Sequence, residues 1–125
     1  EKEIFTLTAG VEDLPWSEYD GEYISIDFYV RVEEDWQGAT WTDPEELEDA
    51  SFSLPEGSYE VVYYAYRDGY GGYLMALEGT IALNSDTTCY IEADDYQVEA
   101  AESWPSWTAW CESADGRLVE LTFNP

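Results

Sequence analysis

Residues Tyr23–Val32 read YISIDFYVRV, where apolar and polar side chains alternate most clearly in this chain. On an extended strand the apolar positions share one face: Ile24, Ile26, Phe28, Val30 and Val32. The positions between them share the other face: Tyr23, Ser25, Asp27, Tyr29 and Arg31. A period of two residues predicts a half-buried antiparallel strand, with its apolar face on the core.

Similar patterns predict further short strands on either side of this one. Ser58–Tyr66 is apolar or aromatic on both faces, so we expect it to lie centrally in a sheet. The other expected strands are Glu3–Thr8, Ala50–Leu54, Tyr73–Leu77, Thr80–Leu83, Thr87–Ala93, Trp107–Cys111 and Arg117–Phe123. We therefore predict an all-β fold, an antiparallel β-sandwich of about seven to nine short strands.

Only Pro44–Glu48 carries a helical signal. Asp43 can cap a helix, Pro44 suits its first position, and acidic side chains follow it. We expect at most one short helical turn there. The length of 125 residues fits a single domain, residues 1–125.

The charge of the chain is strongly one-sided. It carries 29 acidic residues and only four basic ones, for a net charge of −25. Four cations cannot form the basic patch that nucleic acid phosphates require, so we expect no direct nucleic acid binding. No apolar run is long enough to predict a membrane span. A high-salt habitat and a cationic partner are both open explanations of the charge.

The chain has two cysteines, Cys89 and Cys111. In an oxidising compartment they would pair, and the closed loop would contribute about 3 kcal/mol to stability. Two buried thiols in a reducing cytosol are the alternative. The scarcity of Lys and the abundance of Tyr and Trp favour the disulfide, and with it a secreted or cell-surface protein.

The segment FSLPEGSYEV, residues 52–61, resembles a strand entry found in bacterial surface sandwiches. Such entries occur in the prealbumin-like repeats of adhesins and pilins and in fimbrillin-like domains. Pro55 sets a turn, Gly57 supplies backbone freedom, and Tyr59 begins a buried strand. The match covers ten residues, and it implies a sandwich fold with a surface or fibre role.

The chemistry available to the chain is limited by the absence of His. The commonest general base, the usual nucleophile pairs and the usual zinc ligand are therefore missing, and we expect no enzyme activity. No organic cofactor is expected. Carboxylates suit calcium, and the candidate ligands are Glu33, Asp35, Asp94 and Asp95. Solvated acidic loops are the alternative interpretation of these residues.

The aromatic surplus predicts a binding surface. Its candidate residues are Trp36, Trp41, Tyr70, Tyr73, Trp104, Trp107 and Trp110. The last three Trp lie three residues apart, so a polyproline-like segment would align them, whereas a strand would turn Trp107 away from Trp104 and Trp110. Core packing, a protein interface and a sugar platform are the three uses that we weigh.

These observations favour an extracellular, non-catalytic structural or adhesive module, such as a subunit of a surface fibre or complex. Its partner would be a protein or another copy of the chain. In the second case Ile4, Phe5 and Leu7 would belong to a strand donated to a neighbour's sheet. The alternatives are a carbohydrate-binding module that uses exposed Trp and Tyr, and an acidic inhibitor that mimics DNA or neutralises a toxin.

Overall fold

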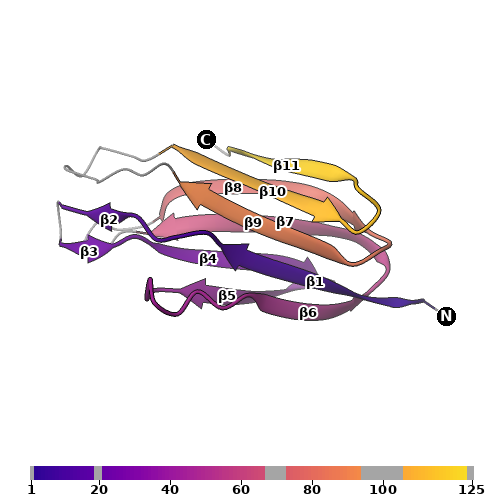
Figure 1. Ribbon diagram of the computed structural model, residues 1–125. Helices are drawn as coiled ribbons and strands as arrows, with labels where there is room; N and C mark the ends of the chain where they lie inside the picture. Colours follow the sequence, from indigo (N-terminus) through magenta and orange to yellow (C-terminus); the bar gives the residue numbers. More distant parts are fainter. Residues whose placement is uncertain (1, 19–20, 67–72, 94–105, 124–125) are drawn as a thin grey trace.

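The structure, a computed structural model, describes residues 2–18, 21–66, 73–93 and 106–123 (Figure 1). Within these residues the chain forms strands and no helix, which confirms the all-β prediction. The strands are β1 (Ile4–Val11), β2 (Trp16–Ser17), β3 (Glu22–Tyr23), β4 (Ser25–Val32), β5 (Asp35–Trp41), β6 (Ala50–Pro55), β7 (Gly57–Tyr66), β8 (Tyr73–Leu83), β9 (Thr87–Ala93), β10 (Trp107–Ser113) and β11 (Leu118–Phe123). The described residues hold no helix of the length and apolarity needed to cross a membrane.

Nine strands form one sheet, in the order β5-β4-β7-β8-β11-β10-β9-β1-β6, and β2 pairs with β3 in a separate ribbon. Neighbours in the large sheet are antiparallel, except that β1 and β9 run parallel. The prediction of a wholly antiparallel fold is wrong at this pair. No tight hairpin joins β1 to β9, so their relative direction is not set by a turn and local sequence cannot reveal it.

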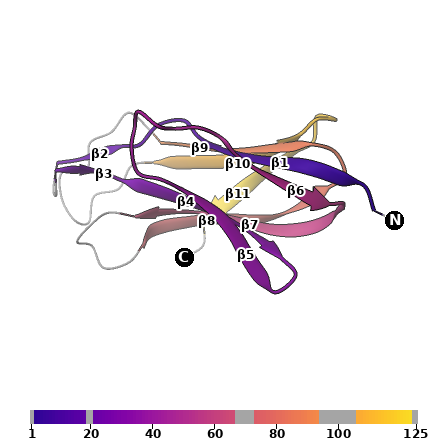
Figure 2. The same cartoon turned by 90° about the horizontal axis from the view of Figure 1, so that it is seen from below.

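The large sheet folds over so that its two halves face each other (Figure 2). One half contains β5, β4, β7 and β8, and the other contains β10, β9, β1 and β6. β11 crosses between them: it pairs with β10 over four residues and with β8 over only two. The result is a single, nearly closed, barrel-like sheet, where the sequence predicts two separate sheets.

The faces of β4 follow the predicted alternation. Ile24, just before the strand, and Ile26, Phe28 and Val30 within it are fully buried, whereas Arg31 is exposed. The Phe28 ring packs against Tyr63 of β7, with centroids 4.8 Å apart, and against Phe52 of β6, 5.9 Å away. Since β6 lies in the opposite half of the sheet, Phe28 contributes to an interior that both halves share.

The strands differ most from the prediction at β8 and β5. β8 runs without a break through Glu78 and Gly79, where the sequence predicts two strands. β5 forms over Asp35–Trp41, where no strand is expected, because Gln37 and Gly38 interrupt the apolar pattern. This strand has one neighbour and is almost entirely exposed, so it needs few apolar residues.

Pro44–Glu48 contains no helix, and only Pro44 and Glu45 form a turn. The Asp43 side chain accepts a hydrogen bond from the Glu45 N–H at 2.9 Å, and the Asp43 carbonyl accepts one from the Glu46 N–H at 2.9 Å. The predicted capping contact therefore exists, but no helix follows it. The indole N–H of Trp41 donates to the Glu48 carbonyl at 2.8 Å, which ties the segment to β5 instead.

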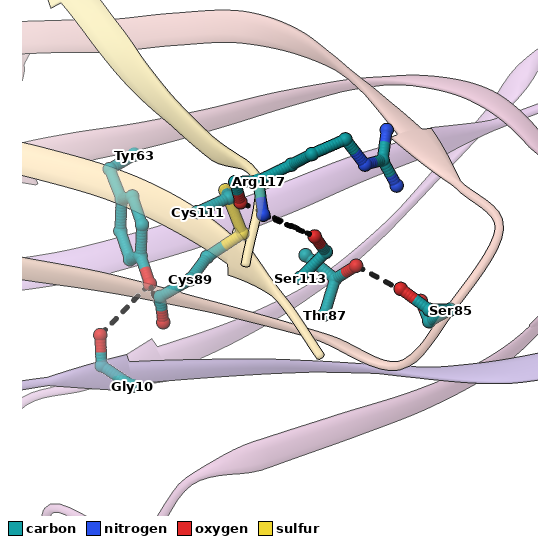
Figure 3. The surroundings of a disulfide bond; sticks show 8 residues. All are labelled: Gly10, Tyr63, Ser85, Thr87, Cys89, Cys111, Ser113 and Arg117. Atoms are coloured by element: carbon teal, nitrogen blue, oxygen red, sulfur yellow. Dashed lines mark hydrogen bonds between the residues drawn. A yellow bond between two sulfur atoms is a disulfide. The ribbon is translucent and has the colours of Figure 1, made fainter. Parts of the chain in front are cut away.

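Cys89 and Cys111 form a disulfide, as the sequence predicts (Figure 3). They are directly opposite each other on β9 and β10, and both side chains are buried in the core. The bond closes a loop with a sequence separation of 22 residues. It therefore links the two strands that flank the residues 94–105, which lie outside the described part of the chain.

Tyr63 joins the two halves of the sheet across the interior (Figure 3). Its side chain is fully buried, and its hydroxyl lies 2.9 Å from the Gly10 carbonyl of β1 and 3.0 Å from the Cys89 carbonyl of β9. Burial raises the pKa of Tyr63, since the ionised form loses its hydration. The hydroxyl thus remains a donor throughout the neutral range.

Replacing Cys89 and Cys111 together by Ala should lower the free energy of unfolding by about 3 kcal/mol, because the unfolded chain regains loop entropy. Urea denaturation of the two proteins measures the difference. An unchanged midpoint with an unchanged slope would show that the bond does not constrain the unfolded chain.

Tyr63→Phe should cost about 1–3 kcal/mol at neutral pH, because it leaves buried carbonyl groups without their donor. The folded pKa of Tyr63 lies above its unfolded value of 10.0. The stability that this group contributes is therefore complete below pH 10 and is lost as the pH rises further, by at most about 1.4 kcal/mol per pH unit. Urea denaturation from pH 7 to 12 should give a shallower alkaline decline for Tyr63→Phe; parallel curves would contradict this assignment.

Candidate functional site

The outward face of the half-sheet β5-β4-β7-β8 carries a row of aromatic side chains. Strand pairing places Gly38, Tyr29, Val62 and Glu78 side by side across the four strands. Trp36 and Tyr64 share this face, because each lies two residues from a member of the row. The ring centroids of Tyr29 and Tyr64 are 6.0 Å apart in an edge-to-face contact.

Two adjoining hollows lie on this face, and together we call them the Trp36 groove. The aromatic hollow has a volume of about 250 Å³ and is lined by Tyr29, Trp36, Val62 and Tyr64. The acidic hollow has a volume of about 230 Å³ and is lined by Trp36, Glu60, Val61, Val62, Glu78, Gly79 and Thr80. Trp36 and Val62 line both hollows, so the Trp36 indole separates an aromatic compartment from a carboxylate-lined one.

The side chain of Trp36 is unusually exposed to solvent for its size and apolar character. It is 49% exposed, although it is among the largest apolar side chains, and it lies on the edge strand β5. Partly exposed aromatic rings that line a concave surface are typical of binding sites. Trp36 is therefore the residue around which we build the candidate site.

The floor of the groove is held in place by Tyr29. Its ring lies across Gly38, where a Cβ atom would approach Cδ1 of Tyr29 to 2.4 Å and the Phe28 carbonyl oxygen to 2.6 Å. Its hydroxyl donates to Asp27 Oδ2 at 3.1 Å. Burial, together with the hydrogen bond to Asp27 and the negative charge of that residue, raises the pKa of Tyr29. Because Gly38 has no side chain, the Tyr29 ring can pack directly over the backbone of the edge strand.

An ion pair borders the acidic hollow. Arg31 Nη1 lies 3.1 Å from Glu60 Oε2, and both side chains are about half exposed. Such an exposed pair contributes little to stability. Among the described residues, no cation pairs with Glu78, whose carboxylate adds a second negative charge to the lining of the acidic hollow.

The described residues of the predicted aromatic surface do not lie on one surface. Trp36 lies in the groove, whereas Trp41 is buried and Trp107 packs against the core. Trp110 lies on the other half-sheet, where its ring centroid is 6.4 Å from that of Tyr90. These residues do not share one face, because a strand places positions an odd number apart on opposite faces, as with Trp36 and Trp41 or Trp107 and Trp110.

The remaining residues of that prediction are not described. Tyr70 and Trp104 lie outside the described residues, and Tyr73 begins β8 with a side chain that is not described. Besides Glu60, Val61, Glu78, Gly79 and Thr80 of the acidic hollow, sequence reasoning missed Tyr29, Val62 and Tyr64 of the aromatic hollow. Tyr29 carried a signal, because it is on the polar face of β4. Val62 and Tyr64 carried none, because Ser58–Tyr66 is apolar or aromatic on both faces and the pattern does not show which face lies outward.

The calcium prediction finds no site in the described part of the chain. Glu33 adopts a positive φ of 60° in the turn between β4 and β5, and Asp35 begins β5. No three potential metal ligands gather anywhere in residues 2–18, 21–66, 73–93 and 106–123. Asp94 and Asp95 lie outside the described residues.

The proposed donor strand has partners on both sides in its own sheet. Ile4, Phe5 and Leu7 of β1 lie opposite Pro55, Leu54 and Phe52 of β6. Leu7 also lies opposite Thr87 of β9 on the other side. In this structure β1 is therefore an internal strand, and donation to a neighbour would require it to leave two partners.

Gly38→Ala should lower the free energy of unfolding by about 1–3 kcal/mol, since the new methyl group meets both the Tyr29 ring and the Phe28 backbone. It should also change the near-ultraviolet circular dichroism, because β5 must shift and carries Trp36 with it. Thr40→Ala, on the same face of the same strand, is the matched control and should stay within about 0.5 kcal/mol. Equal effects of the two substitutions would show that nothing is packed over Gly38.

Comparison of the chain with models of protein families, with curated proteins and with solved structures finds no match. The case for a function therefore rests on the geometry of the groove, the disulfide and the charge.

Proposed function

We propose that this chain is an extracellular, non-catalytic module with an adhesive or structural role, a subunit of a surface fibre or surface complex that binds a partner protein. The observation that carries the proposal is the Trp36 groove. It presents a half-exposed indole and two Tyr rings on a rigid sheet face, and this combination of aromatic groups is enriched at protein interfaces.

The disulfide supports the extracellular part of the proposal. Cys89 and Cys111 are the only cysteines in the chain, and they are bonded to each other inside the core. Such bonds persist in oxidising compartments and are rare in the cytosol. The same bond counts against an intracellular acidic inhibitor, since that function requires a reducing compartment and free thiols.

The resemblance to bacterial surface sandwiches supports the fibre role. Pro55 ends β6 and Gly57 begins β7, and this connection between two strands supports the proposal. The Glu56 N–H donates to the Glu3 carbonyl at 2.8 Å, and the Tyr59 hydroxyl donates to the Pro55 carbonyl. A prealbumin-like or fimbrillin-like relationship is part of this proposal, with the two facing halves of the large sheet as the two layers of the sandwich.

A carbohydrate-binding module is the second candidate, and the same groove favours it. Sugars have apolar faces that stack on aromatic rings and hydroxyl groups that donate to carboxylates. Trp36 provides an exposed ring, and Glu60 and Glu78 provide acceptors beside it. A carbohydrate-binding module and a protein-binding adhesive module would use the same groove and differ in the ligand. One experiment can therefore distinguish the two functions.

Beads that display the chain should adhere to at least one of four coated surfaces: the basic protein lysozyme, starch, xylan or cellulose. Trp36→Ala should reduce bead retention at least tenfold, since a central aromatic contact is worth about 2 kcal/mol or more at an interface. Phe123→Ala removes another exposed ring, from β11 and outside the groove, and should leave retention unchanged.

Retention on lysozyme would support the protein-binding role, and retention on a polysaccharide alone would support the glycan role. If wild-type and Trp36→Ala beads behave alike on every surface, the groove is not a binding site and the proposal fails. Circular dichroism melts of both variants check that the fold is retained.

A further inference from the structure

Resting on that proposed function, we infer that the Trp36 groove binds the Lys or Arg side chains of a basic partner protein. The aliphatic stem of the side chain lies in the aromatic hollow, and the cationic head reaches the carboxylates of the acidic hollow. The inference concerns the occupant of the groove and follows from the arrangement of its two compartments.

The two hollows match the two ends of a long cationic side chain. Tyr29, Val62 and Tyr64 form an apolar compartment on one side of Trp36, and Glu60 and Glu78 lie on the other side. Lys and Arg carry an apolar stem and a charged end, so they are the side chains that can fill both compartments at once. A wholly apolar side chain would desolvate the Glu78 carboxylate without supplying it with a partner.

The aromatic rings themselves favour a cation. A Lys ammonium or Arg guanidinium near the face of an aromatic ring is attracted by its quadrupole, and Trp is the strongest of the three ring types. Trp36 and the two Tyr rings line one compartment, so a cation that enters it meets ring surfaces as well as carboxylates. The attraction of a cation to the rings and its attraction to the carboxylates act together beside Trp36, because Trp36 borders both hollows.

Charge complementarity selects a basic partner over a second copy of this chain. The net charge of −25 creates a negative field that draws cationic molecules and repels another copy. The chain has only Lys2, Arg31, Arg67 and Arg117 to offer a neighbour, and Arg31 already pairs with Glu60. A neutral glycan would use the rings but gain nothing from the field.

The test uses fluorescein-labelled peptides in which four Arg, four Lys or four citrulline residues alternate with Gly-Ser spacers. Citrulline keeps the shape of Arg and removes its charge. Fluorescence anisotropy should show that the folded, disulfide-bonded chain binds the Arg and Lys peptides at least tenfold more tightly than the citrulline peptide. Affinity should fall as salt rises, since the attraction is screened.

Four variants then separate the groove from the general negative charge. Trp36→Ala leaves the net charge at −25 and should weaken binding at least fivefold. Glu78→Gln should weaken it at least threefold, whereas Glu112→Gln, which removes the charge of an exposed side chain of β10 on the other half-sheet, should stay within twofold. Phe123→Ala should have no effect. Thermal melts confirm that each variant is folded.

The result that overturns the inference is equal affinity of wild type and Trp36→Ala for the Arg peptide, which would reduce binding to non-specific attraction. Equal affinity for the Arg and citrulline peptides would also overturn it, because the cation would then be irrelevant. Binding to starch, xylan or cellulose that depends on Trp36, without peptide binding, would reject the cationic ligand and leave the groove as a glycan site.

Discussion

The structure depends on burying one face of nearly every strand between two halves of a single sheet. A chain with a net charge of −25 repels itself, so the apolar interior must outweigh both that repulsion and the loss of chain entropy. Phe28 and Tyr63 lie at the centre of that interior, where they touch each other and reach strands of the opposite half. The disulfide adds a covalent link within the same interior, between β9 and β10. Carboxylates are left on the outward faces and in the connections, where water and counterions solvate them.

The alternation that builds the core also builds the groove. Once Phe28 and Tyr63 are fixed inward, Tyr29, Val62 and Tyr64 must lie outward, because successive side chains on a strand point to opposite faces. Cross-strand register then brings side chains distant in the chain into one row: Tyr29 lies opposite Gly38 of β5 and Val62 of β7. The groove therefore needs no special loop. Its aromatic rings belong to strands whose backbone is fixed by the core. Binding of a ligand would therefore cost little free energy for ordering the groove.

Local sequence was sufficient for the features that depend on a few adjacent residues. The faces of β4, the extent of β9 and the central place of β7 follow from alternation and from nearby turn residues. The pairing of Cys89 with Cys111 could be predicted because the chain has two cysteines and therefore only one possible pair. Features that depend on long-range pairing could not be obtained this way, and the parallel contact of β1 with β9 is the clearest example. The groove belongs to the same class, since it exists only when β5, which looks like a loop in the sequence, pairs with β4.

The groove lies beside an edge strand, which favours aggregation, and the net negative charge of the chain opposes that aggregation. β5 ends the sheet, so one row of its backbone groups is open to pairing with another chain, and an exposed Trp there would favour aggregation. Folding the Tyr29 ring over Gly38 covers part of the strand, and Asp35 places a carboxylate at its start. The strong negative charge of the whole molecule then opposes edge-to-edge contact between identical copies. The charge that permits an exposed aromatic edge is thus the same charge that selects a cationic molecule to cover it.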